Sequence, residues 1–370
     1  MPARLGHAGA NPGIGPQRFL QLLQRFGDAG SAAHAGHGQL RDILDGKTLA
    51  ALDAGDGARA AEAALQWAEG ADCHLLTLND DDYPCQLAEA GSAPPLLFAR
   101  GRRSLLAQPM LAVVGSRHAT PQGADNARDF SQRLAAHGYS IVSGLAGGID
   151  AAAHEGALPE AGSTIAVIGT GIDRVYPARN RELAHRIAGH GLILSEFALG
   201  TPPLAGHFPQ RNRIIAGLAR GCTVVEAAPQ SGSLITARLA LEAGRDVMAI
   251  PGSIHNPQAR GCHRLIRDGA RLVESADDVL DEIGRLPAAP AVDAAAMPAA
   301  GSADAHPLLA AIGYDPADAD TLAARLKLTA GSFTRCFLSL SWPDTSKVWT
   351  AGATSADHRR QAVPPNPMIK

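Results

Sequence analysis

The strongest constraint on the fold is a set of short apolar segments that alternate with helical segments between residues 108 and 284. These segments are MLAVVG, YSIVSG, TIAVIGTG, GLILSE, CTVVEAA, RDVMAIPG and, more weakly, ARLVES. Strands this apolar, separated by helices, form parallel sheets that are covered on both faces. The pattern predicts a doubly wound α/β fold with a mostly parallel sheet, in which ligands bind outside the carboxyl ends of the strands.

Glycine or serine follows five of these predicted strands. Glycine permits positive φ angles and close backbone approach, and exposed N–H groups at turns and helix N-termini attract anions. Turns that share one edge of the sheet therefore predict a phosphate-binding surface. We expect Gly147→Val to damage its loop, since a β-branched residue disfavours positive φ. The turn residues are Gly115, Ser116 and Arg117; Ser143, Gly144, Gly147 and Gly148; Gly169 and Gly171; Ser231, Gly232 and Ser233; and Gly252 and Ser253.

The spacing of these glycines excludes several nucleotide-binding and catalytic motifs. The stretch GLAGGID does not fit G-x-G-x-x-G with an acidic residue about twenty positions later. The chain has no G-x-x-x-x-G-K-[ST], no G-x-S-x-G elbow, and no H-E-x-x-H or H-x-E metal signature. We therefore expect neither a cofactor nor a metal.

Asp150 and His154 are four positions apart and share one face of a predicted helix. They are either an acid/base or metal pair, or an Asp stabilised by the helix dipole together with a His packed beneath the loop. No third ligand or nucleophile is in register with them. We favour the second interpretation.

Two arginines, Arg211 and Arg213, flank Asn212 in the segment HFPQRNRIIAGLARG. In a helix they lie about 200° apart, so one can face a ligand while the other is structural. Guanidinium groups suit phosphate oxygens. Residues 205–275 hold 9 arginines and 5 acidic residues, although the net charge of the chain is -3. An anionic partner would bind there, unless these arginines only pair with neighbouring carboxylates.

The start of the next predicted helix carries three hydroxyl side chains, Ser231, Ser233 and Thr236. They can cap the helix or bind phosphate, and capping is the more common role.

The cysteines and the hydropathy indicate the compartment. The 5 cysteines are scattered without a C-x-x-C pair, which argues against a zinc site or disulfides and favours a reducing compartment. The N-terminus has no apolar signal segment, and no run of 18 apolar residues occurs. These features predict a soluble, cytoplasmic protein with no membrane partner.

Six motifs in unbroken order over residues 108–284 resemble the DNA-processing protein A family (DprA, also called Smf). They are VVGSR, SGLAGGIDAAAHEGAL, TIAVIGTGIDRVYPARNREL, HFPQRNRIIAGL, SGSLITARLALEAGRDVMAIPG and GCHRLIRDGA. The resemblance implies an extended Rossmann-like fold that binds single-stranded DNA and forms a homodimer. It also implies a recombination mediator that protects incoming DNA in natural transformation and helps to load the RecA recombinase, without catalysis.

The resemblance also implies which residues bind DNA. Arg117 looks like a phosphate contact, and Phe208 and Tyr176 are the candidates for base stacking. For Tyr176, core packing is favoured over stacking. The other implied site residues are Gly115, Ser116, Ser143, Gly144, Gly147, Gly148, Asp150, Arg211, Asn212, Arg213, Ser231, Gly232 and Ser233.

The chain divides into five predicted parts. Residues 1–104 form a helical domain of the sterile-alpha-motif or helix-hairpin-helix type. Its turn at Gly13 and Gly15 either offers N–H groups to a DNA phosphate or, as we favour, simply enters a helical bundle. Residues 105–284 form the Rossmann-like domain. An Ala/Pro-rich linker (285–307), a partial winged-helix-like domain (308–340) and an atypical, disordered tail (341–370) follow.

Two departures from the family pattern matter. Ala205 and Gly206 stand where some members carry a basic residue before HFP, so Arg211 or another cation must supply that phosphate contact. After Leu340, the glycine and strand residues of a wing are absent.

A nucleotide-processing enzyme on a related scaffold is the alternative function. Phosphoribohydrolases carry a PGGxGTxxE motif with a catalytic glutamate. The stretch EAAPQSGSLITARLALE lacks the double glycine, and Glu226 and Glu242 lie outside that spacing. Nucleotide release from a nucleoside monophosphate would discriminate between the two. A purely structural protein would leave the five phosphate-binding turns unexplained.

Overall fold

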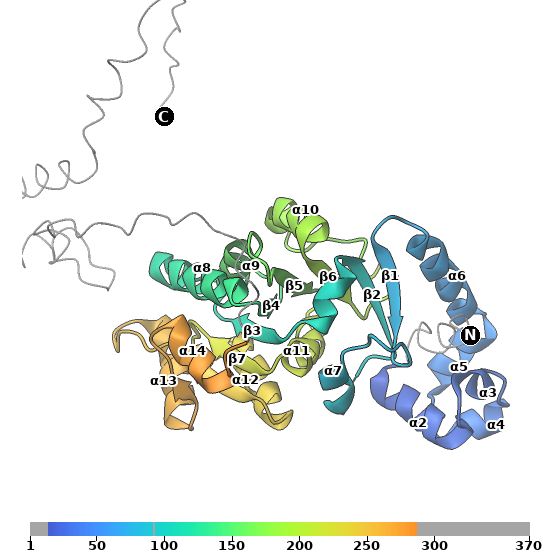
Figure 1. Cartoon of the computed structure of the whole chain (residues 1–370). Helices are drawn as coiled ribbons and strands as arrows, with labels where there is room; N and C mark the ends of the chain where they lie inside the picture. Colours follow the sequence, from blue (N-terminus) through green and yellow to red (C-terminus); the bar gives the residue numbers. More distant parts are fainter. Residues whose placement is uncertain (1–13, 92, 287–370) are drawn as a thin grey trace, which may run out of the picture. The chain divides into compact units, whose positions relative to one another are not determined.

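The described residues, 14–91 and 93–286 of a computed structural model, contain the strands β1 (Cys73–Thr77), β2 (Leu96–Gly101), β3 (Met110–Val114), β4 (Ser140–Ser143), β5 (Thr164–Val167), β6 (Leu192–Ser195), β7 (Gly221–Val224), β8 (Asp246–Ala249) and β9 (Arg271–Leu272). They form one sheet in the order β1-β2-β6-β5-β4-β3-β7-β8-β9 (Figure 1). From β6 through β9 in this order, neighbouring strands are parallel. From β3 the chain builds outward to β6 and then returns to place β7 on the other side of β3. This reversal makes a topological switch point at the carboxyl end of β3.

The helices of the same residues are α2 (Pro16–Phe26), α3 (Ala29–Ala33), α4 (His37–Leu40), α5 (Gly46–Asp53), α6 (Asp56–Ala68), α7 (Cys85–Glu89), α8 (Pro121–Ala136), α9 (Ile149–Ala157), α10 (Arg181–His190), α11 (His207–Leu218), α12 (Gly232–Glu242), α13 (Arg260–Arg267) and α14 (Ala276–Ile283). They cover both faces of the sheet. Leu111 and Val113 of β3 pack in one core with α8, α9 and α14. Ala112 and Val114 pack in another with α11, α12 and α13. Successive strand residues point to opposite faces, so burial on both faces explains why the strands are apolar throughout.

The predicted doubly wound, mostly parallel sheet is confirmed, and all seven apolar segments form strands, β3 to β9. The structure differs in the range 73–101, which lies within the predicted helical domain. There β1 pairs antiparallel with β2, and β2 pairs antiparallel with β6. The side chains of Leu97 and Phe98 in β2 are buried. This short apolar run is therefore a buried strand at the edge of the parallel sheet.

The N-terminal helices have a core of their own. Phe19 and Leu22 of α2 pack with Leu40 and Leu49 of the following helices. Gly15 precedes α2 as its N-cap and makes no side-chain cap hydrogen bond. The segment is thus a small helical bundle, and whether its glycine turn offers N–H groups to a DNA phosphate stays a prediction; Gly13 lies outside the described residues.

The parts predicted after residue 286, which are most of the linker, the winged-helix-like domain and the tail, lie outside the described residues. Among the residues that the structure describes, no helix is both long and apolar enough to cross a bilayer.

Candidate functional site

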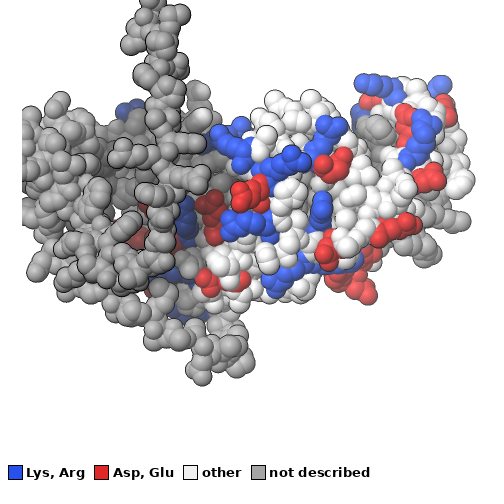
Figure 2. Space-filling view, turned by 90° about the horizontal axis from the view of Figure 1, so that it is seen from above, with Lys and Arg blue, Asp and Glu red and all other residues white. Residues whose placement is uncertain are grey.

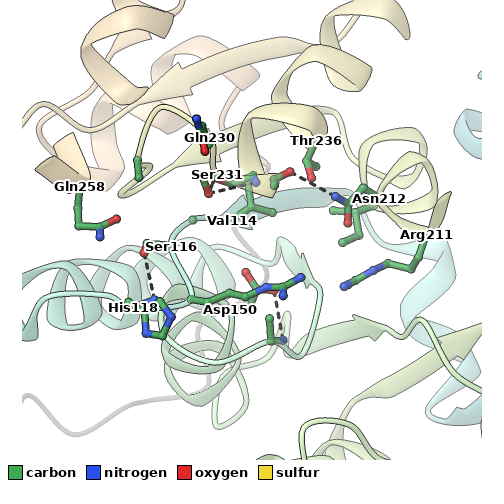
Figure 3. Close-up of a pocket in the computed structure, with 17 residues that line it drawn as sticks. Val114, Ser116, His118, Asp150, Arg211, Asn212, Gln230, Ser231, Thr236 and Gln258 are labelled. Carbon is green, nitrogen blue, oxygen red and sulfur yellow. Dashed lines mark hydrogen bonds between the residues drawn. The ribbon is translucent and has the colours of Figure 1, made fainter. Parts of the chain in front are cut away.

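A pocket of about 390 Å³ lies at the switch point, at the carboxyl ends of β3 and β7 (Figure 3). Its walls come from the turn after β3, the loop after β4, one face of α11 and the N-terminus of α12. This is where the fold class predicts a ligand. The lining residues are Val114, Gly115, Ser116, Arg117, His118, Ala146, Asp150, Arg211, Asn212, Ile215, Ala228, Gln230, Ser231, Gly232, Ser233, Thr236 and Gln258.

The glycine loop, residues 144–148, is held in place by hydrogen bonds to its backbone. Asn180 donates from Nδ2 to the carbonyl oxygens of Leu145 (2.9 Å) and Ala146 (3.0 Å). The Leu145 N–H donates to Nε2 of His154 at 3.2 Å. The Ala146 N–H donates to Asp150 at 3.3 Å. Buried side chains therefore fix the loop from below and leave its outer surface to a ligand.

Of the two adjacent glycines, Gly147 and Gly148, only Gly148 has a backbone conformation that other residues rarely adopt. Gly148 has a φ of +73°, and a Cβ there would press on the carbonyl oxygen of Ser116 and lie 2.9 Å from the carbonyl carbon of Arg117. Gly147 has no positive φ, so the reason given for the effect of Gly147→Val is wrong. A Cβ on Gly147 would instead overlap the guanidinium of Arg179. Of the glycines in the loop, only Gly148 therefore has a positive φ; Leu145 also adopts one, at +55°.

His154 is a structural residue packed beneath the glycine loop. This agrees with the interpretation that we favoured over an acid/base or metal pair with Asp150. The His154 side chain is fully buried, and its Nδ1 lies 2.7 Å from the hydroxyl of Thr164. That hydroxyl donates to the carbonyl oxygen of Ile141, so Nδ1 carries the proton and Nε2 accepts from Leu145. Burial lowers the pKa of His154 to about 3, with a smaller contribution from the charge of Arg211. The imidazole is therefore neutral at physiological pH.

This low pKa predicts acid sensitivity. The unfolded chain protonates this His near its ordinary pKa of 6.5, whereas the folded chain does so only near 3. The contribution of this pKa difference to the free energy of unfolding is fully present above pH 6.5 and is lost as pH falls toward 3. Between pH 6.5 and 5 the loss amounts to roughly 2 kcal/mol. Urea unfolding at several pH values, for the wild type and for His154→Gln, measures it. The stability difference between the two proteins should shrink as pH falls, and a constant difference would contradict the assignment.

Arg211 is a buried cation in the pocket wall. Its side chain is 3% exposed, and Nη1 donates to the carbonyl oxygen of Val167 at 2.7 Å. Its Nε has no hydrogen-bond partner among the described residues. Burial lowers the pKa of Arg211 to about 10, although the charge of Asp150 opposes this. The guanidinium thus remains charged in the pocket wall, and its Nε is a buried donor without a partner among the described residues.

Asp150 is the carboxyl group that lies near Arg211 in this wall. Its carboxyl is buried, which raises its pKa, while the charge of Arg211 and the hydrogen bond from Ala146 oppose the shift. A Cβ on Gly144 would overlap the Arg211 guanidinium and lie 2.6 Å from Oδ2 of Asp150. Gly144 therefore provides the space in which these two side chains lie together.

Six predicted site residues do not line the pocket: Ser143, Gly144, Gly147, Gly148, Phe208 and Arg213. Three of them have structural contacts away from it. Arg213 forms a buried ion pair with Glu196, two positions along α11 from Arg211. Burial lowers the pKa of Arg213, and the charge of Glu196 opposes this shift. The hydroxyl of Ser143 donates to the carbonyl oxygen of Val113 at 2.7 Å. Gly147 lies beneath Arg179 on the outer surface of the loop. The two arginines are thus separated as their helical spacing predicted.

The opposite wall is the N-terminus of α12. Ser231 is the N-cap, and its hydroxyl accepts from the N–H of Ser233 at 3.3 Å. The two serine hydroxyls are 2.7 Å apart. Asn212 reaches the same turn, donating to the carbonyl oxygen of Gly232 at 3.4 Å. The capping role expected for Ser231 is present, and the positive end of the α12 dipole faces the pocket.

An aromatic ledge lies beside the glycine loop. The Phe208 ring is tilted against the Tyr176 ring, with 5.6 Å between their centroids. The guanidinium of Arg117 lies over Phe208, 5.4 Å from its centroid. Tyr176 is 47% exposed, so the core packing that the sequence analysis favoured for it is wrong. In the segment after β5, Ile172 and Val175 pack in or against a core, whereas the side chain of Tyr176 lies at the surface.

Two residues that the sequence analysis did not assign, Arg179 and Asn180, belong to this site. Both lie in the motif YPARN, and both reach the glycine loop from more than thirty positions along the chain. The sequence signal was the motif itself, which carries an arginine and an amide eight and nine positions after the predicted strand segment TIAVIGTG. Arg179 is an exposed cation whose guanidinium lies beside Gly147 of the loop.

The carboxylates considered for an enzyme serve other purposes. Glu226 accepts from the N–H (2.9 Å) and the hydroxyl (2.7 Å) of Thr120, and its carboxylate packs against Gly123 at the start of α8. Glu242 is exposed and forms an ion pair with Arg238. Neither lines the pocket. Within residues 14–91 and 93–286, no cluster of His, Cys, Asp and Glu could hold a metal ion.

Comparisons with known proteins match this fold and these motifs. A family model of DNA recombination-mediator protein A matches residues 74–284, and a model of the DprA winged helix domain matches residues 287–341. The DNA processing protein DprA of Streptococcus pneumoniae is 54% identical over 207 residues, which are 56% of this chain and 73% of that protein. Protein Smf of Escherichia coli is 46% identical over 223 residues, 60% of each chain.

Two solved structures extend the comparison. The X-ray structure of DprA from Streptococcus pneumoniae has a TM-score of 0.67 at 42% identity, covering 76% of this chain and 98% of that one. A structure that addresses the single-stranded DNA binding mode of DNA processing protein A from Helicobacter pylori has a TM-score of 0.52 at 30% identity. It covers 57% of this chain and 95% of that one. With these matches and the motifs around the pocket, the chain belongs to the DNA recombination-mediator protein A family, DprA/Smf.

Proposed function

We propose that this chain binds single-stranded DNA at the switch-point pocket, chiefly through the phosphate backbone. The observation that carries this proposal is Arg211, a buried cation whose Nε has no partner, opposite the N-terminus of α12. Both groups attract a phosphate and neither reads a base. The Helicobacter pylori relative, whose structure concerns single-stranded DNA binding, supports the same ligand for this chain.

The shape of the site favours a single strand over a duplex. A concave pocket of about 390 Å³ has room for one nucleotide of a flexible strand, whereas a duplex holds its bases stacked and its backbone rigid. The ledge of Tyr176 and Phe208, with Arg117 above it, offers a face on which a base can stack. Affinity should therefore be strongly salt-dependent and nearly independent of sequence.

Family membership supports a proposal for the biological role. We propose that the chain is a recombination mediator that protects incoming strands in natural transformation, helps to load RecA onto them, and acts as a homodimer without catalysis in the cytoplasm. We also propose that the chain is divided into the five parts predicted from its sequence. They are the helical domain, the Rossmann-like domain, the linker, the partial winged-helix-like domain and the tail, with the bounds given under the sequence analysis.

The first test is fluorescence anisotropy of a labelled poly-dT oligonucleotide across a salt series, beside a duplex of equal length. We expect tight binding of the single strand, a steep fall with salt, and weak binding of the duplex. Equal affinity for both, or no binding at low salt, would contradict the proposal. Release of free base from a nucleoside monophosphate would favour the enzyme alternative instead.

Arg117→Ala should weaken binding for all sequences alike. The side chain is exposed on the ledge, so we expect a loss of about fivefold rather than a complete loss. The slope of log affinity against log salt should flatten by about 0.7, because one phosphate contact on a single strand is removed. Anisotropy titrations at several salt concentrations measure both. An unchanged slope would show that Arg117 does not contact a phosphate.

A further inference from the structure

Exposed arginines without a carboxylate partner gather on and beside α10. Elsewhere in the described residues, many exposed arginines form ion pairs, as Arg128 does with Asp125 and Arg285 with Asp277. In contrast, no carboxylate of the described residues lies within ion-pair distance of four arginines that share this side of the sheet. They are Arg102, Arg179, Arg181 and Arg186. Their positive charge is therefore available to an external partner.

These arginines surround one shallow hollow in the surface, with a volume of about 780 Å³. Figure 2 looks onto the side of the molecule on which α10 lies and shows basic side chains gathered over the middle of the described surface. Arg102 borders the hollow, since its Nη1 donates to the carbonyl oxygen of His190 at 3.2 Å. The lining residues are Arg179, Arg181, Glu182, His185, Arg186, Gly189 and His190. Glu182 is thus the one carboxylate in a lining that holds three arginines.

One residue, Arg179, connects the hollow to the glycine loop. Arg179 lines the hollow and also lies directly on Gly147 of the glycine loop. The neighbouring loop residue, Ala146, lines the switch-point pocket. A strand that leaves the pocket over the glycine loop therefore meets Arg179 first and then the arginines of α10. α10 has 10 residues, and its length of about 15 Å is enough for more than one phosphate.

The chemistry of the hollow favours a polyanion over a protein partner. Apart from Gly189, every residue of its lining has a charged or polar side chain. The apolar residues of α10, which are Leu183, Ala184 and Ile187, face the core instead. Protein interfaces usually have an apolar centre and are depleted in charge there. Guanidinium groups pair readily with phosphate oxygens without reading a base.

We infer that α10 and Arg102 form a track that holds the sugar–phosphate backbone of a DNA strand after it leaves the pocket. This inference rests on the proposed function, because it assumes that a strand occupies the pocket. The track lengthens the binding site without adding specificity. It predicts that a short oligonucleotide uses the pocket alone and that a longer one uses both.

The test compares the full-length wild type with the double variant Arg181→Ala/Arg186→Ala on two oligonucleotides of about 5 and about 20 thymidines. The short one should bind both proteins equally. The long one should bind the variant about tenfold more weakly, with a salt slope lower by about 1.4, the value for two phosphate contacts on a single strand. The control, Arg128→Ala/Arg133→Ala, removes the same charge from α8 and should leave both affinities unchanged.

The other possible outcomes refute either the proposed function or the track alone. If the wild type binds neither oligonucleotide, the proposed function fails. If the wild type binds both and the α10 variant binds the long one equally well, only the track fails. If the variant loses the same factor on both lengths, or the α8 control loses as much as the α10 variant, the arginines act through general charge and the track is again refuted.

Discussion

Replacing Arg211 with Met should lower the affinity for single-stranded DNA about 100-fold and destabilise the fold by about 3 kcal/mol. The affinity falls because the pocket loses a charged donor that is already desolvated, and hydrogen bonds to charged groups are the stronger kind. The stability falls because Asp150 and the carbonyl oxygen of Val167 lose their partner inside the protein. Anisotropy and urea unfolding measure the two effects separately.

Arg213→Met is the matched control for this prediction. It removes the same side chain from the same helix, and it too leaves a buried carboxylate, Glu196, without its partner. Its stability should fall by a similar amount, while its DNA affinity at a temperature where it is folded should remain that of the wild type. If both variants lost affinity equally, the loss would reflect damage to α11, and Arg211 would have no direct role in binding.

Gly148→Ala should lower the free energy of unfolding by about 4 kcal/mol and Tm by about 10 °C. A side chain at a φ of +73° costs about 1–2 kcal/mol. The new Cβ would also press on the backbone of Ser116 and Arg117, which cannot move aside as a flexible side chain can, and this adds about 1–3 kcal/mol. Differential scanning calorimetry measures the shift. DNA affinity should fall as well, because the turn that carries Arg117 is displaced.

Gly244→Ala separates the cost of a side chain at a positive φ from the cost of the steric contact with the backbone. Gly244 has a φ of +70°, but a Cβ there would have nothing within 4 Å. This variant should therefore lose only about 1–2 kcal/mol from the conformation and bind DNA normally. Equal losses in the two variants would mean that the contact between the glycine loop and the turn after β3 contributes nothing.

The central sheet could be predicted from the sequence because its strands are buried on both faces. Such strands appear as continuous apolar runs, and helices between them leave few topologies open. The same reasoning indicated where the pocket lies, since the turns after β3 and β7 meet at the switch point; the predicted turn residues Gly169, Gly171, Gly252 and Ser253 do not line it. The spacing of Arg211 and Arg213 also indicated, from helical geometry alone, that one of them would face away.

Contacts across the fold could not be predicted. Asn180 holds the backbone of Leu145 from 35 positions away, and no local pattern reports such a contact. The role of Arg179 depends in the same way on where its turn meets Gly147. Tyr176 was misassigned because an aromatic residue in a short polar segment has no periodicity by which to judge its burial. The pair β1 and β2 was missed because two short strands at a sheet edge give a weak signal beside the longer helical patterns around them.

The antiparallel strand β2 determines where this chain can be shortened. It pairs with β6 over four residues, from Phe98 opposite Ser195 to Gly101 opposite Leu192. A fragment that started at residue 105 would leave the outer backbone groups of β6 unpaired, and such a bare edge is a template for self-association. A fragment that starts before Cys73 would keep this border closed. Residues 73–101 therefore cover the edge of β6, and β1 becomes the outermost strand of the sheet.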